Sequence, residues 1–196
     1  IVHTDGFEED DPSALVADPG VSLTRAGDVA RNGGWSLLVD DLTGYGQGVT
    51  LLVGPQRLPP GYYRVTAWVR LADDSGPAAV QVVGPALVGP EDPSWIGALV
   101  GAEDHRSVQP RITRLRGAEW SSTTIFLERR PGAAGPLAVR LRPVAYCDDA
   151  PAVPYPFHVD DVEVEYLGPE EPSLPQLAPM ACPLTPPNDP SGDPVG

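Results

Sequence analysis

The chain is a succession of short hydrophobic segments separated by turn-forming residues. Hydrophobic and polar side chains alternate most clearly in Tyr62–Leu71 and in Val162–Tyr166. An alternation with a period of two predicts a β-strand with one buried face. We expect strands at Val21–Arg25, Trp35–Asp40, Gln47–Val53, Tyr62–Leu71, Ala78–Val83, Arg111–Arg116, Ser121–Glu128, Leu137–Pro143 and Phe157–Tyr166.

The segments between these strands are typical of turns. Glycine and proline dominate Asn32–Gly34, Pro59–Gly61 and Pro131–Gly132, and no stretch of ten or more residues combines a helical period with capping residues. Short strands without helices must bury their apolar faces against one another. The sequence therefore predicts an all-β fold, a two-sheet antiparallel β-sandwich.

One stretch is less regular. Val83–Gln109 contains Gly84-Pro85, Gly89-Pro90 and a single tryptophan, Trp95. We expect a long loop at an edge of the sandwich, which serves either as a binding surface or as an ordered structural insertion.

Proline is concentrated at the C-terminal end. The 196 residues include 25 Pro and 21 Gly, and 9 of the prolines fall within the last 29 residues, Gly168–Gly196. Frequent proline excludes a central strand and favours an extended polyproline conformation. We therefore expect a folded domain over residues 1–167 and a proline-rich, extended tail over residues 168–196.

The charge narrows the classes of partner. With 27 acidic and 13 basic side chains and a net charge of −14, the chain is not expected to bind nucleic acid or an anionic membrane. No apolar run reaches the roughly 18 residues of a membrane span, so we expect no membrane insertion. The sequence starts at Ile1 rather than Met, which we interpret as a mature protein secreted into an oxidising compartment.

Four motifs follow one another in a specific order. They are Gly6-Phe7-Glu8, Gly34–Val39, the Pro-Gly-Tyr-Tyr strand Pro60–Arg70, and Phe157–Val164 with its Asp-Asp-Val sequence. In this order they resemble the jelly-roll carbohydrate-binding modules of families 4, 9, 16 and 22. The resemblance spans about Phe7 to Leu167. It implies a jelly-roll sandwich and a polysaccharide ligand.

The resemblance also implies a structural calcium ion between the first and last strands, with Glu8 and Asp160 as ligands. Asp160 has the same parity as Val162 and Val164, so we expect it to point inward, and Asp161 outward. An inward carboxylate needs a counter-charge, which calcium with oxygen ligands would supply. The alternative is an Asp160 at the sheet rim, either hydrated or paired with an arginine.

Sugar rings stack on exposed aromatic side chains in modules of this type. Trp35 and Trp68 lie within strand motifs, and we expect them in the core. Tyr45, Trp95 and Trp120 fall in turns or loops and are the candidates for sugar stacking.

No arrangement of residues indicates catalysis. The three histidines, His3, His105 and His158, have no partner at metal-ligand spacing, and no nucleophile or phosphate-loop motif is present. The acidic residues are too many for a catalytic pair to be identified. We expect the protein not to be an enzyme.

The tail has apolar residues that a solvated linker does not need: Leu174, Leu177, Met180 and Leu184. On an extended rod they are expected to dock in a groove of the same domain or of a neighbour. Cys182 lies among them, and a Cys147–Cys182 disulfide would fix the tail to the sandwich. Two free thiols and interchain bridges are the alternatives.

Two functions follow from these observations. The first is a non-catalytic extracellular subunit that assembles with copies of itself into a filament, through head-to-tail contacts made by the tail. The second is a carbohydrate-binding module for xylan or β-glucan from a secreted polysaccharide-degrading enzyme.

Overall fold

The computed structural model describes residues 3–8, 15–45, 47–53, 58–73, 78–83, 105–109, 111–115, 117–133, 137–143 and 153–174. Every regular element in these ranges is a strand, which confirms the all-β prediction. The strands are β1 (His3–Asp5), β2 (Leu15–Ala17), β3 (Ser22–Ala26), β4 (Ser36–Asp40), β5 (Val49–Val53), β6 (Gly61–Leu71), β7 (Ala78–Val83), β8 (His105–Gln109), β9 (Arg111–Leu115), β10 (Ser121–Arg129), β11 (Leu137–Pro143) and β12 (Phe157–Gly168).

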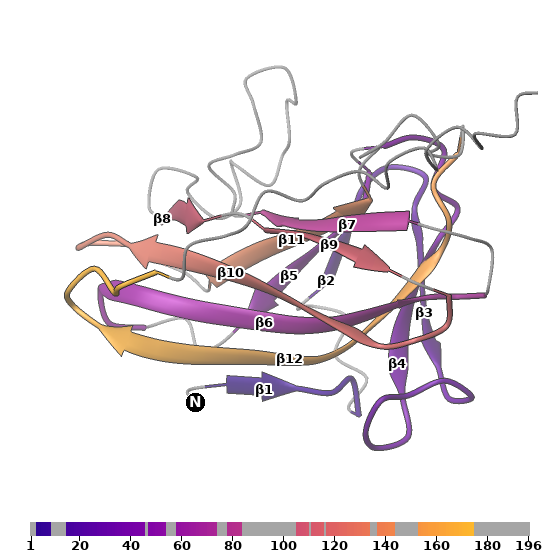
Figure 1. Ribbon diagram of the computed structural model, residues 1–196, viewed down its shortest axis with the longest axis horizontal. Coiled ribbons are helices and arrows are strands. Elements are labelled where there is room, and N and C mark those ends of the chain that lie inside the picture. Colours follow the sequence, from indigo (N-terminus) through magenta and orange to yellow (C-terminus); the bar gives the residue numbers. More distant parts are fainter. Residues whose placement is uncertain are drawn as a thin grey trace, which may run out of the picture.

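The strands form two sheets that face each other as a sandwich (Figure 1). The seven-stranded sheet has the order β3-β4-β12-β6-β10-β8, and β1 pairs with β12 beside it. The five-stranded sheet has the order β2-β5-β11-β7-β9. Every strand pair is antiparallel, as the short connections and alternating patterns predict.

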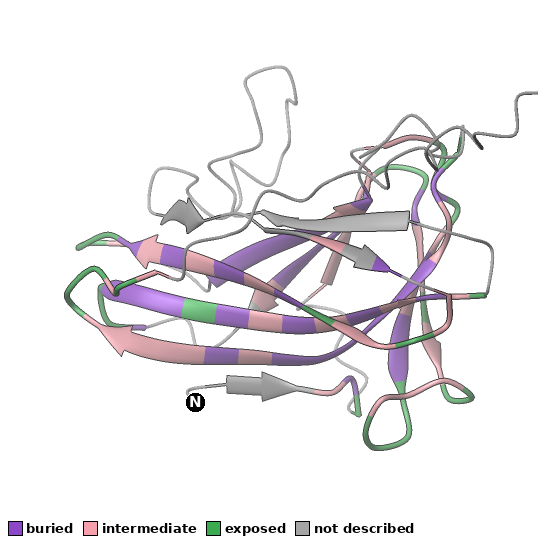
Figure 2. Ribbon diagram, viewed as in Figure 1, coloured by how far each residue is buried: buried purple, intermediate pink, exposed green. Residues whose placement is uncertain are grey.

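The core lies between the two sheets and follows the alternation in the sequence. Along β6, Tyr63, Val65, Ala67, Val69 and Leu71 are buried, while the residues between them are exposed or half-buried (Figure 2). The facing sheet contributes the buried residues Val49, Leu51, Leu137, Val139 and Leu141. Burial of these alternating side chains is the main stabilising contribution to the sandwich.

Strand β12 has two partners on one edge. Its first residues, Phe157–Val159, pair with β4, and its later residues, Val162–Val164, pair with β1. Between these segments the pairing of β12 with β6 shifts register, because Asp161 and Val162 together oppose one residue of β6. The ends of β1 and β4 therefore meet at this β-bulge.

The structure adds three strands that alternation did not predict. β1 and β2 have three residues each, too few for a recognisable period. β8 lies within the segment expected to be a loop and is paired with β10. Of the segment expected to be a long loop or an ordered insertion, the last five residues, His105–Gln109, are therefore an ordered strand, and residues 84–104 lie outside the described ranges.

The described residues contain no helix long and apolar enough to cross a membrane. Among the described residues β12 is the last strand, and it ends at Gly168. The division of the chain at residue 168 stays a prediction.

Candidate functional site

The predicted metal ligands Glu8 and Asp160 lie close together at the β12 bulge. A Cβ atom placed on Gly6 would lie 3.8 Å from Glu8 Cγ and 3.9 Å from Asp160 Oδ1. It would also lie 3.6 Å from Asp161 Oδ1. The side chain of Glu8 and the carboxylates of Asp160 and Asp161 therefore lie next to the residue that follows β1.

Asp160 is fully buried, but it does not point into the core. In the β12–β6 ladder Val159 pairs with Val69, and both are core residues. The next residue, Asp160, pairs with Trp68, and successive residues of a strand point to opposite faces. Asp160 therefore lies on the outer face of the seven-stranded sheet. The predicted inward orientation was wrong because the bulge inserts one residue and reverses the parity. Asp161 is that inserted residue and has a positive φ of 46°.

Backbone N–H groups satisfy the Asp160 carboxylate. Arg31 N donates to Asp160 Oδ2 at 2.7 Å, and Asp161 N donates to Asp160 Oδ1 at 2.8 Å. Burial raises the pKa of Asp160, and these hydrogen bonds oppose that rise. The carboxylate is thus held by the segment that precedes β4.

The Arg31 side chain extends the same contact. Its guanidinium forms an ion pair with Asp161 Oδ2 and lies 3.7 Å from the centre of the Trp68 ring. Asn32 Nδ2 also donates to Asp161 Oδ2, at 2.5 Å. The ion pair is with Asp161 and not with Asp160, and Asp160 contacts Arg31 only through the backbone N–H, so the alternative of a rim Asp160 paired with an arginine side chain was wrong.

Glu8 joins the N-terminal segment to β4. Its Oε1 accepts hydrogen bonds from Gly34 N at 2.9 Å and Trp35 N at 3.2 Å. Arg25 donates to the carbonyl oxygens of Phe7 and Glu8. Gly33 has a positive φ of 69°, and a Cβ there would overlap the Glu8 carboxylate, so this close approach requires glycine.

These groups match the chemistry of a hard cation only in part. Within the described residues, Glu8 Oε2 and Asp161 Oδ1 accept no hydrogen bond, and oxygen is the ligand that calcium prefers. In the same ranges no group of three or more His, Cys, Asp or Glu side chains is arranged to hold a metal ion. A calcium ion here would need backbone oxygens, and its presence stays a prediction.

Three tryptophans each lie against an arginine. The Arg25 guanidinium lies 4.2 Å from the centre of the Trp35 ring, and the Arg70 guanidinium lies 5.7 Å from the centre of the Trp120 ring. Trp35 is 38 % exposed, so its predicted core position was wrong. Trp68 is half-buried on the outer face of its sheet and is likewise not a core residue.

Tyr45 lies in the loop between β4 and β5, as predicted, and is half-buried. Burial, and secondly the neighbouring phenol of Tyr155, raise the pKa of Tyr45. Tyr155 precedes β12 and packs partly against the core. Sequence reasoning did not single out Tyr155. Trp95 lies outside the described residues.

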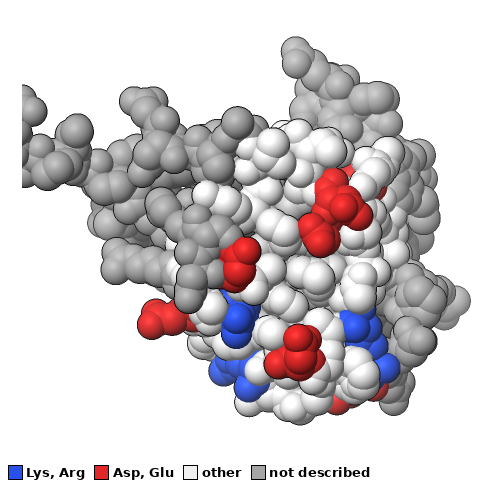
Figure 3. All heavy atoms as spheres, turned by 90° about the vertical axis from the view of Figure 1, so that its right-hand side faces the viewer, with Lys and Arg blue, Asp and Glu red and all other residues white. Residues whose placement is uncertain are grey.

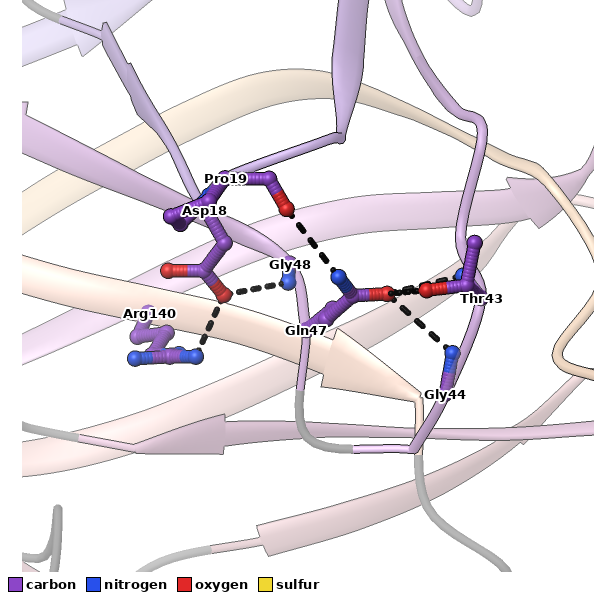
Figure 4. A network of polar contacts seen from close by, with 7 residues as sticks. All are labelled: Asp18, Pro19, Thr43, Gly44, Gln47, Gly48 and Arg140. Atoms are coloured by element: carbon purple, nitrogen blue, oxygen red, sulfur yellow. Dashed lines mark hydrogen bonds and ion pairs between the residues drawn. The ribbon is translucent and has the colours of Figure 1, made fainter.

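A network of polar contacts surrounds the Tyr45 loop (Figure 4). Gln47 contacts Thr43, Gly44 and Pro19 through its carboxamide. The next residue, Gly48, donates its N–H to Asp18 Oδ2 at 2.8 Å, and the same oxygen forms an ion pair with Arg140. The loop is therefore bound to the segment after β2 and, through Asp18, to β11.

This network adjoins the outer face of the five-stranded sheet. Thr50 and Arg140 are opposite each other in the β5–β11 ladder, on the face away from the core, and both are buried. Within the described part of the chain, Thr50 Oγ1 has no hydrogen-bond partner. A buried hydroxyl without a partner is costly, and an enclosed water molecule is the partner that such an atom usually has.

No local signal identified this network in the sequence. The alternation in Leu137–Pro143 places Arg140 on the outer face, but its partner Asp18 is 122 residues away in sequence. Gln47 was included in a predicted strand, whereas it precedes β5. Only the folded topology brings these side chains together.

The acidic side chains visible in Figure 3 form separate groups, several of them beside arginines. Among the described residues on this face they do not form one continuous acidic surface.

Most of the predicted tail features lie outside the described residues. Leu174 is half-buried in the segment after β12. Leu177, Met180, Leu184, Cys147 and Cys182 are not described, so tail docking and the disulfide stay predictions.

The fold is similar to solved sugar-binding domains. The CBM22-2 xylan-binding domain of Xyn10C from Paenibacillus barcinonensis matches with a TM-score of 0.60 and 12% identity, over 85% of this chain and 99% of that domain. The CBM22-1 xylan-binding domain of the same protein matches with a TM-score of 0.57 and 16% identity, over 84% and 93% of the two chains.

The CBM22-1-GH10 modules of Clostridium thermocellum xylanase 10B, solved with xylohexaose, match with a TM-score of 0.56 and 13% identity. This match covers 85% of the present chain and 28% of that chain. No protein-family model matches the sequence, and a search of curated proteins finds no significant match. The structural matches confirm the predicted jelly-roll resemblance at the level of the fold.

Proposed function

We propose that this protein is a non-catalytic carbohydrate-binding module that acts outside the cell and binds a xylan-type polysaccharide. The observation that carries the proposal is the similarity of the whole sandwich to complete xylan-binding domains, over 84–85% of this chain. The same matches cover 93–99% of those domains.

We propose that the ligand binds at the loop between β4 and β5 that contains Tyr45. A sugar ring presents apolar C–H faces and hydroxyl groups, so its site combines aromatic rings with hydrogen-bonding side chains. Tyr45 supplies a ring with the Tyr155 phenol nearby, and the exposed Thr43 supplies a hydroxyl group in the same loop. Trp35, Trp68 and Trp120 lie on or next to strands of the seven-stranded sheet, where each contacts an arginine, and are not part of this site.

Replacing Tyr45 with alanine is expected to weaken binding of soluble xylan about tenfold, because the stacking ring is lost. Tyr45→Phe keeps the ring and should retain most of the affinity. Trp35→Ala removes an exposed aromatic side chain near the bulge and should leave affinity unchanged. Affinity electrophoresis on xylan, β-glucan and cellulose measures all three variants.

Two results would count against this assignment. A wild-type protein that none of the three polysaccharides retards would contradict the binding function. Equal losses in the Tyr45 and Trp35 variants would contradict the location of the site, and Trp95→Ala and Trp120→Ala would then test the remaining predicted rings.

We also propose that calcium binds at the bulge, with Glu8, Asp160 and backbone oxygens as its ligands. An ion at 100 times its Kd stabilises a protein by about 2.7 kcal/mol. Excess chelator is therefore expected to lower the Tm by roughly 5–10 °C in a domain of this size. Differential scanning calorimetry in chelator, and again after calcium is restored, measures the effect; an unchanged Tm would exclude the ion.

Self-assembly through the tail stays a prediction of the sequence. The fold similarity favours a binding module over a filament subunit, because the domains that it matches are described as xylan-binding.

A further inference from the structure

The side chain of Gln47 closes the loop that contains Tyr45. Its Oε1 accepts hydrogen bonds from Thr43 N at 2.7 Å, Thr43 Oγ1 at 3.0 Å and Gly44 N at 3.1 Å (Figure 4). Three donors converge on one carboxamide oxygen. The backbone on the N-terminal side of Tyr45 is thus fixed by a side chain from its C-terminal side.

The other end of the same carboxamide joins the loop to the sheet. Gln47 Nε2 donates to the carbonyl oxygen of Pro19, the second residue after β2, at 3.1 Å. The adjacent residues repeat the connection, since Gly48 N donates to Asp18 Oδ2. Asp18 is in turn paired with the buried Arg140 of β11. The loop is therefore held at two successive positions.

We propose that Gln47 is a positioning residue for sugar binding, which acts by fixing Tyr45 before the ligand arrives. This inference rests on the proposed function. Tyr45 lies between Gly44 and Gln47, both of which belong to the network. A ring that is already ordered loses less conformational entropy on binding, so the same contact gives a higher affinity.

The geometry requires both ends of the glutamine. Alanine removes all four hydrogen bonds, and asparagine is one methylene shorter. Glutamate keeps an acceptor for Thr43 and Gly44 but has no N–H for the carbonyl oxygen of Pro19. Gln47→Ala and Gln47→Glu therefore separate closure of the loop from its attachment to Pro19.

The decisive measurement is a double-mutant cycle with xylohexaose by isothermal titration calorimetry. Gln47→Ala is expected to raise the Kd about 3- to 10-fold, the effect of ordering one side chain on binding. In a Tyr45→Ala background the same substitution should change the Kd by less than about twofold, because its target is gone. In a Trp35→Ala background the full effect should remain. Equal losses in the Tyr45 and Trp35 backgrounds would overturn the proposal.

A second measurement does not depend on the sugar. Amide hydrogen exchange at Thr43 and Gly44 should be faster in Gln47→Ala than in wild type, and close to wild type in Gln47→Glu. Unchanged exchange in Gln47→Ala would overturn the role of Gln47. If xylohexaose does not bind wild type, the proposed function fails, while faster exchange still supports a loop fixed by Gln47. If Gln47→Ala does not fold, Gln47→Glu replaces it in the double-mutant cycle. The result that then supports the proposal is a Gln47→Glu variant that loses affinity when Tyr45 is present and keeps it in the Tyr45→Ala background.

Discussion

Replacing Asp160 with alanine is expected to lower the free energy of unfolding by about 3 kcal/mol. The side chain is fully buried and accepts the N–H groups of Arg31 and Asp161. Its removal leaves two donors without acceptors in a place that water does not reach. For a domain of this size the loss corresponds to a decrease in Tm of roughly 6–12 °C.

Two matched variants sharpen the interpretation. Asp160→Asn keeps one acceptor oxygen and should lose less stability than Asp160→Ala. Glu165→Ala removes a carboxylate from the same strand, but its pair with Arg64 is solvent-exposed and contributes less than about 1 kcal/mol. Chemical denaturation of the three variants gives the comparison. If Asp160→Ala is no less stable than Glu165→Ala, the hydrogen bonds at the bulge do not stabilise the fold.

Gly48→Ala is the second substitution from which we expect a large effect. A Cβ at this position would overlap the carbonyl oxygen of Leu141 and lie 3.0 Å from the Cα of Arg142. Both atoms belong to the backbone of β11, so no side-chain rotation relieves the overlap. β5 would have to move away from β11 just beside the Val49–Leu141 pair, at a cost of about 3 kcal/mol.

Gly44→Ala is the control in the same loop. Nothing lies within 4 Å of a Cβ placed there, so stability should be unchanged or slightly higher. Thermal unfolding of both variants tests the contrast. Equal Tm values for Gly48→Ala and wild type would mean that the loop does not approach β11 this closely.

The sequence predicted the long strands because alternation is a local property of each segment. β7 and β11 have the predicted bounds, and β6, β10 and β12 differ from prediction by at most two residues at an end. β8 could not be predicted in this way, since it is defined by its partner β10. Strands that depend on a distant partner leave little trace in their own residues.

The bulge was predictable in principle. Phe157 and Val159 alternate in one phase, Val162 and Val164 in the other, and two aspartates separate the pairs. An alternation extended backward from Val164 alone does not include this change of phase, and it therefore assigns Asp160 to the buried face. The Asp18–Arg140 pair had no such signal, because its two members are 122 residues apart in the sequence.

The arrangement of β1 beside β12 has a mechanical consequence. His3 is opposite Val164, and Asp5 is opposite Val162, so the start of β1 and the end of β12 lie at the same end of the ladder (Figure 1). Tension applied between these two ends would separate the strands one hydrogen-bonded pair at a time. Peeling of this kind needs less force than sliding all the pairs at once, so β1 would detach first when the domain is pulled.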